Sequence, residues 1–122
     1  MLLGLKEELA IDCDAIPRIA TPFGAGIGRT GMLCGVVTGS LMGLGLLKGR
    51  DVGGGDVIPA FDAAREFVEA FQEKFGNIEC RSLIGYDLTS RAQRKIFAVR
   101  KVKETSCRSY LEWAIGQLTP YL

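Results

Sequence analysis

Histidine is absent from the 122 residues of the sequence. This absence excludes Ser-His-Asp and Cys-His catalytic sites, CxxCH haem attachment, imidazole zinc sites and the usual proton shuttle at neutral pH. Any chemistry must therefore rest on cysteine, carboxylates, lysine or backbone groups.

The sequence also lacks a CxxC pair. Its four cysteines are separated by 21, 46 and 27 positions: Cys13, Cys34, Cys80 and Cys107. Zinc ribbons and thioredoxin-like sites hold two sulfurs on one tight turn, so this spacing excludes both. The first ten residues lack the basic start, long apolar run and cleavage site of a signal peptide. We therefore expect a cytoplasmic protein with reduced thiols.

An excess of charge of one sign is missing as well. Lys and Arg number 15 against 14 Asp and Glu, for a net charge of +1. This balance argues against nucleic-acid binding by bulk electrostatics, and we expect no nucleic-acid partner. One run from Arg91 to Lys103 holds six cations and no acid. Such a run is more often a solvated helix face, with phosphate contacts as a minor alternative, and it can equally dock an acidic partner.

The 18 residues from Thr30 to Leu47 contain no charged side chain, and this stretch approaches the length of a transmembrane span. Its five glycines lower its hydrophobicity, so we expect no membrane insertion. Four of these glycines recur at every fourth position: Gly31, Gly35, Gly39 and Gly43. On a helix they form a smooth stripe that admits another backbone at short range. We predict a buried, glycine-rich helix at the centre of a bundle.

Apolar residues recur at helical spacing along most of the chain. The most regular segment is 57–75, with Asp56 as its N-cap and Gly76 as its end. The other predicted helices are Leu2–Leu9, Ala15–Ala20 capped by Asp14, Ile78–Gly85, Ser90–Lys101 capped by Asp87 or Thr89, and a last helix from Thr105 or Ser106 to Leu118. We predict an all-α, compact bundle of about five to six helices around the glycine-rich helix, in a single domain over residues 1–122.

A glycine-rich stretch, Gly26-Ile-Gly28-Arg-Thr-Gly31, fits the GxGxxG pattern. A dinucleotide fingerprint needs a preceding strand within a βαβ unit, and the approach here is interrupted by Pro17 and Pro22. We therefore interpret the stretch as a glycine turn into a packed helix. Arg29 beside it is a candidate to hold an anion.

Three cysteines fall on predicted helices. Cys34 lies inside the glycine-rich helix, while Cys80 and Cys107 lie near helix N-termini, each followed by an arginine. A helix N-terminus and a neighbouring cation favour thiolate over thiol. Lone cysteines are also common as small apolar core residues, so position alone leaves both interpretations open.

Two segments resemble a known family. One is Gly24-Ala-Gly-Ile-Gly-Arg29-Thr-Gly-Met-Leu-Cys34-Gly-Val-Val-Thr-Gly39, and the other is Phe71-Gln-Glu-Lys-Phe-Gly76-Asn-Ile-Glu-Cys80-Arg-Ser-Leu-Ile-Gly85. With Cys107 and Tyr110 following in order, they resemble the redox-active protein family C_GCAxxG_C_C, named for four cysteines and a CGAxxG motif. The resemblance covers most of the chain from about Leu2 onward.

The chain departs from the family pattern at two places. Val36 stands where the motif has alanine. The family's first cysteine would stand before Met1, and Cys13 is about one helix length away from that place, so we do not count it as the match. We expect either a start that has been shortened or a member that works with three sulfurs.

The resemblance implies electron transfer or thiol redox chemistry. A similar domain accompanies haem-binding segments in split-Soret cytochromes c, where it looks like an iron–sulfur module, but no haem motif or histidine is present here. Three thiolates could hold an iron–sulfur cluster that a non-protein or partner ligand completes. Two of the thiols could instead form a reversible disulfide.

We therefore predict a homodimeric redox protein with a redox partner protein and a site formed by Cys34, Cys80 and Cys107. These sulfurs are the predicted catalytic residues and the predicted ligands of an iron–sulfur cluster. Gly31 and Gly35 would let neighbouring backbone approach, and Arg29 would position an anion or partner. The rival hypothesis is a structural or adaptor protein with inert cysteines and a glycine-rich helix used for assembly.

Overall fold

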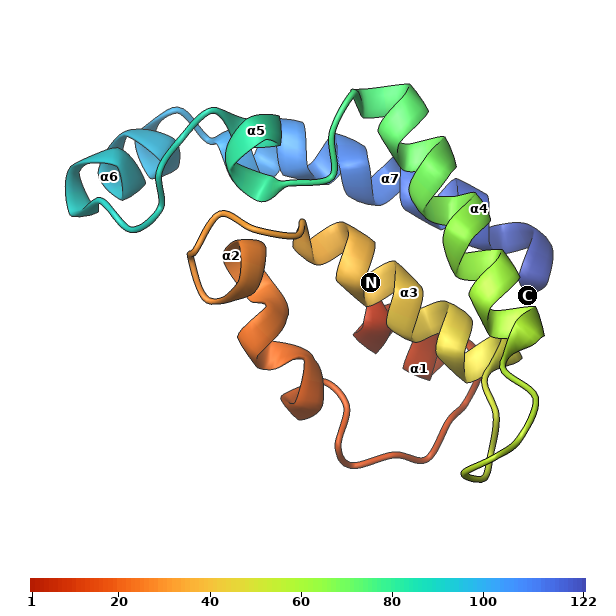
Figure 1. Cartoon of the computed structure of the whole chain (residues 1–122). Helices are drawn as coiled ribbons and strands as arrows, with labels where there is room; N and C mark the ends of the chain where they lie inside the picture. The colour runs from red at the N-terminus through yellow and green to blue at the C-terminus, as the bar shows by residue number, and fades with distance from the viewer.

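A computed structural model describes residues 1–122 and contains helices and turns but no strand (Figure 1). The seven α-helical segments are α1 (Leu2–Glu8), α2 (Gly24–Ile27), α3 (Gly35–Lys48), α4 (Ile58–Phe75), α5 (Cys80–Ile84), α6 (Arg91–Val99) and α7 (Arg108–Leu118). Three short turns complete the chain: the 3₁₀ turns η1 (Arg18–Phe23) and η3 (Thr119–Tyr121), and the π-helical turn η2 (Lys103–Cys107). The predicted all-α class is confirmed.

The core lies where α1, α4 and α7 pack against α3 (Figure 1). Helix α4 is amphipathic and directs Phe67 and Phe71 inward. The Phe71 ring is fully buried, with its centroid 4.8 Å from that of Phe75, 5.6 Å from that of Trp113 and 6.0 Å from that of Tyr110. Tilted and edge-on aromatic pairs at such distances stabilise the seam between α4 and α7 beyond simple burial.

Glycines on α3 bring α1 close. A Cβ at Gly43 would collide with the Leu5 side chain, and one at Gly39 would lie 3.2 Å from the Met1 Cβ. The prediction that Gly31 belongs to the helical glycine stripe is wrong, because α3 begins at Gly35 and Gly31 lies in a turn with a φ of +76°. None of the helices is both long and apolar enough to cross a bilayer.

The segment after α1 also differs from the prediction. Residues 15–20 do not form an α-helix capped by Asp14; the chain instead turns and then forms η1, which includes Pro22. Proline lacks the N–H that an α-helix interior needs, so two prolines close together favour the tighter and shorter 3₁₀ turn.

Helix ends in the second half of the chain differ from the predicted caps at two N-termini. The N-cap of α4 is Val57 and not Asp56, although the Asp56 carboxylate accepts from the Ile58 N–H at 3.0 Å; Gly76 ends α4 with a φ of +83°, as predicted. At α6 the N-cap is Ser90, whose Oγ accepts from the Gln93 N–H at 3.3 Å, so the prediction of Asp87 or Thr89 is wrong. The Asp87 carboxylate is already used, since it accepts from the Thr89 N–H and hydroxyl.

Candidate functional site

One cavity of about 600 Å³ lies beside the bundle and is lined by three of the four cysteines, Cys34, Cys80 and Cys107. The lining is mostly apolar. Its apolar side chains include Val36, Leu83, Ile84, Leu88, Phe97 and Leu111. Cys13 lies in the segment between α1 and η1 and does not line this cavity. The three sulfurs therefore come from three distant parts of the sequence, whereas the fourth is elsewhere.

A short backbone pairing joins the first two of these cysteines. The Cys34 N–H donates to the Ile78 carbonyl at 2.9 Å, and the Cys80 N–H donates to the Met32 carbonyl at 2.6 Å. These two bonds place Leu33 opposite Glu79 in an isolated antiparallel bridge. As a result Cys34 caps α3 and Cys80 begins α5 at the same edge of the cavity.

The bridge between Leu33 and Glu79 brings the segments of Cys34 and Cys80 together without joining their sulfurs. All four cysteines are free thiols in the structure.

A left-handed backbone turn forms the wall beside Cys80. Every φ from Ala25 to Arg29 is positive, between 54° and 73°. Gly26 in this turn is buried, and a Cβ there would lie 2.5 Å from the Cys80 Cβ and 3.1 Å from its sulfur. The Gly26 carbonyl accepts from the Thr30 hydroxyl at 2.7 Å and from the Met32 N–H at 3.0 Å. Only glycine at this position leaves room for the Cys80 side chain.

The other three predicted site residues are placed differently. Gly35 lines the cavity. Gly31 is buried just outside it, where a Cβ would lie 3.0 Å from the Arg81 Cβ. Arg29 is exposed and does not line the cavity. The structure therefore brings Gly35 to the thiols, lets Gly31 admit the backbone next to Cys80, and leaves Arg29 on the surface.

The third cysteine lies at a change of helix type. Cys107 ends the π-helical turn η2 and leads directly into α7. Such π-turns occur often at functional sites. One turn further on, the Tyr110 hydroxyl donates to the Leu83 carbonyl at 3.0 Å and ties α7 to α5 across the cavity wall.

Two site residues were missed by sequence reasoning. Tyr110 was seen only as part of the family resemblance, and Gly26 only as part of a glycine turn. The sequence holds a signal for both, since each stands near a cysteine segment. No local pattern, however, ties Gly26 to Cys80 or Tyr110 to Leu83, because these contacts depend on how α5 folds back.

Burial controls the protonation of the three thiols. The pKa of Cys80 is raised to about 11, mainly by burial and also by negative charge on Cys34 and Cys107. Burial likewise raises the pKa of Cys34 and of Cys107; for Cys107 a charge on Cys34 adds to the effect and Lys103 opposes it. The pKa of Tyr110 is raised by burial and by the same three thiols. These groups sense one another's charge across the cavity.

The expectation that neighbouring arginines favour thiolates is therefore wrong. Arg81 donates to the Asp87 carboxylate at 3.0 Å, and Arg108 donates to Glu112 at 3.0 Å, both on exposed side chains. Cations that are already paired and solvated stabilise a nearby thiolate little, so desolvation dominates.

The donor set at the cavity consists of three thiols. No group of three or more His, Cys, Asp or Glu side chains is arranged to hold a metal ion as it stands. Thiolate sulfurs are the soft ligands that iron–sulfur clusters take, and a cavity of this volume is in the range of small-cofactor sites. The residue type therefore suits such a cluster, whereas the positions of the side chains as they stand do not form a metal site.

The fold and the cavity define a helical protein with three clustered thiols and no histidine. Residues 1–120 match the family described as "Putative redox-active protein (C_GCAxxG_C_C)", and the chain belongs to this family. The resemblance noted in the sequence is thereby confirmed. Comparison with curated proteins and with solved structures gave no match.

Proposed function

We propose that this chain is an electron-transfer protein in which Cys34, Cys80 and Cys107 hold an iron–sulfur cluster. The observation that carries the proposal is the convergence of three thiols from distant segments on one cavity. Membership of a redox-active family supports the same general role.

The protonation of the thiols favours a cluster over a bare dithiol. A thiol whose pKa is about 11, as for Cys80, is almost entirely protonated at neutral pH and attacks disulfides slowly. Metal coordination removes this obstacle, because it deprotonates the thiols.

The residues around the cavity would each have a defined task. The three cysteines would bind as thiolates, and a non-protein or partner ligand would complete the set. When bound, such a cluster supplies reversible uptake of an electron. Val36, Leu83 and Leu111 would keep water from the sulfurs, and this exclusion tunes the potential of such a site. Gly26 would hold the left-handed turn against Cys80.

The rival, a structural or adaptor protein, has one observation in its favour. Cysteines with raised pKa values in apolar surroundings are typically inert. Without a metal, the same three thiols would be only small apolar side chains at a cavity wall.

Anaerobic purification with iron and sulfide analysis and a visible spectrum separates the two. We expect bound iron in the native chain and its loss in Cys34→Ser, Cys80→Ser and Cys107→Ser. Cys13→Ser is the matched control and should keep the iron. Absence of metal from anaerobically prepared protein, with thiols that never pair, would leave only the adaptor role.

Homodimeric assembly and a cytoplasmic location remain predictions from the sequence. Exposed apolar side chains on α4 and α7, Ile58, Phe61 and Ile115, are compatible with an interface between two copies. Sedimentation velocity of the native chain and of Phe61→Glu tests this. A dimer that persists unchanged in the variant would place any interface elsewhere.

A further inference from the structure

Helix α6 and the residues that follow it differ in charge from the other helices. The run from Arg91 to Lys103 holds six cations, three of them in α6, and no acid. The three salt bridges of the molecule, Arg65–Asp62, Arg81–Asp87 and Arg108–Glu112, involve none of these six. None of the α6 residues is fully buried, and the helix lies at the end of the molecule furthest from α4 (Figure 1). The run is therefore an uncompensated positive surface.

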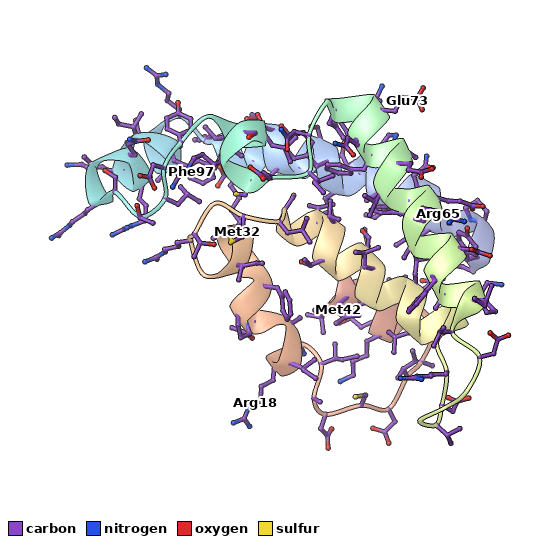
Figure 2. All side chains as sticks on the ribbon, in the orientation of Figure 1. Arg18, Met32, Met42, Arg65, Glu73 and Phe97 are labelled. Atoms are coloured by element: carbon purple, nitrogen blue, oxygen red, sulfur yellow. The ribbon has the colours of Figure 1, made fainter.

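This surface is attached directly to the wall of the thiol cavity. Phe97 and Leu88 both line the cavity. The Arg94 guanidinium donates to the Leu88 carbonyl at 2.8 Å. The Phe97 ring, labelled in Figure 2, packs edge-on against the Tyr86 ring with centroids 6.0 Å apart. One side of α6 thus faces the thiols while the other faces solvent.

The solvent side of α6 combines two kinds of side chain. The side chains of Arg91 and Lys95, one turn apart, are exposed and form no hydrogen bond or salt bridge in the structure. Beside them Ile96 is 44% exposed and Val99 73% exposed. Protein interfaces typically combine apolar contacts with a charged rim, whereas a phosphate backbone gives aliphatic side chains nothing to pack against. The mixture therefore favours a protein over a nucleic acid.

We infer that the solvent side of α6, with Arg91, Lys95, Ile96 and Val99, docks an acidic electron-transfer protein. The inference rests on the proposed function, since the electron lost by the partner would be gained by the cluster that the three cysteines would hold, with no covalent bond made or broken. Carboxylates of the partner would face Arg91 and Lys95, and an apolar patch would cover Ile96 and Val99. Charge complementarity of this kind speeds association and fixes orientation.

The test uses a small acidic ferredoxin as the probe and measures its association by surface plasmon resonance over a salt series. We expect binding that weakens with salt and an association rate that falls roughly tenfold in Arg91→Glu/Lys95→Glu. The control Arg18→Glu/Lys74→Glu carries the same change of net charge on exposed side chains elsewhere; Arg18 points away from the body of the protein (Figure 2). It should change the rate by no more than about twofold.

The contact side chain Val99 supplies a second variant. Val99→Ser should weaken binding without altering its salt dependence, because it removes apolar contact and no charge. Equal losses in the two charge-reversal variants, or no binding even at low salt, would overturn the docking inference. Tighter binding of duplex DNA than of the ferredoxin, lost in the same variant, would overturn it in favour of nucleic acid.

The readout is binding, so the inference and the proposed function fail separately. Iron-free protein that still binds the probe through α6 contradicts the cluster alone. Iron-loaded protein that does not bind the ferredoxin contradicts the docking surface alone.

Discussion

The bundle end and the cavity end of this molecule follow different rules. In the bundle of α1, α3, α4 and α7, regular right-handed helices surround a core in which Phe71 is fully buried. At the cavity end, five consecutive residues have positive φ, a π-turn interrupts the last helix, and α6 has no buried residue. A cavity of about 600 Å³ takes the place of a core there.

The difference separates what holds the chain folded from what gives it chemistry. Aromatic and aliphatic burial in the bundle supplies the favourable free energy. Left-handed residues other than glycine cost about 1–2 kcal/mol each, and such strain persists only where the surrounding structure enforces it. Three of them, Ala25, Ile27 and Arg29, lie in the turn against Cys80. The packed bundle therefore offsets the strain of the left-handed turn.

The largest expected loss of stability comes from removing a buried side chain of the bundle core. Phe71→Ala removes the ring at the centre of the aromatic cluster and should lower the free energy of unfolding by about 3–5 kcal/mol. Phe61→Ala, on the same helix but 64% exposed, is the matched control and should change it little. Urea unfolding followed by circular dichroism measures both. Similar losses in the two variants would mean that the core is not where the structure places it.

A smaller effect is expected from filling the cavity wall. Gly26→Ala and Gly28→Ala both force alanine into a left-handed conformation, with φ of 68° and 58°. A Cβ at Gly28 would meet only the Pro22 carbonyl oxygen, at an ordinary 3.9 Å, whereas a Cβ at Gly26 would collide with Cys80, so Gly26→Ala should cost about 1–3 kcal/mol more. Urea unfolding gives the difference, and the iron content of the two variants should differ in the same direction. Equal costs would show that the turn does not press on Cys80.

The bundle end could be predicted well from sequence, because its rules are local. The apolar period of α4 and its end at Gly76 are visible in residues a few positions apart. The cavity end could not be predicted in the same way. The start of α3 at Gly35 and the pKa of Cys80 depend on the pairing of Leu33 with Glu79, which are far apart in the chain.

The candidate site could be predicted only in part, because it too depends on contacts between residues far apart in the chain. The choice of Cys34, Cys80 and Cys107 came from the family resemblance, and the structure puts all three at one cavity. Their protonation was predicted with the wrong sign, because flanking arginines are visible in sequence whereas burial and the acids that pair with those arginines are not.

Alkaline pH should lower the free energy of unfolding through the buried thiols of the cavity end. In the folded protein the pKa of Cys80 is raised from 9.0 to about 11, so the folded state keeps a proton that the unfolded chain has lost. The contribution is fully present below pH 9 and is lost as the pH rises toward 11. Cys34 and Cys107 act with the same sign.

Urea unfolding at about pH 8 and about pH 10.5 measures this loss. Cys80→Ala should show a smaller loss than the native chain, since it removes the group with the largest shift. Titrating lysines and tyrosines are common to both proteins and cancel in the comparison. An identical loss in the variant would mean that Cys80 is not buried at the cavity in solution.

The smallest expected effect is that of replacing alanine by glycine, which should raise the free energy of unfolding at the cavity end and lower it in the bundle. Ala25 is exposed with a φ of 54°, so Ala25→Gly relieves left-handed strain of about 1–2 kcal/mol against an entropic cost of about 0.5–1 kcal/mol. The net result is a gain of about 0.5–1 kcal/mol in the free energy of unfolding. Ala64→Gly, inside α4 of the bundle, should instead lose about 1 kcal/mol. Losses in both variants on urea unfolding would contradict the left-handed turn itself, and with it the surface that Gly26 presents to Cys80.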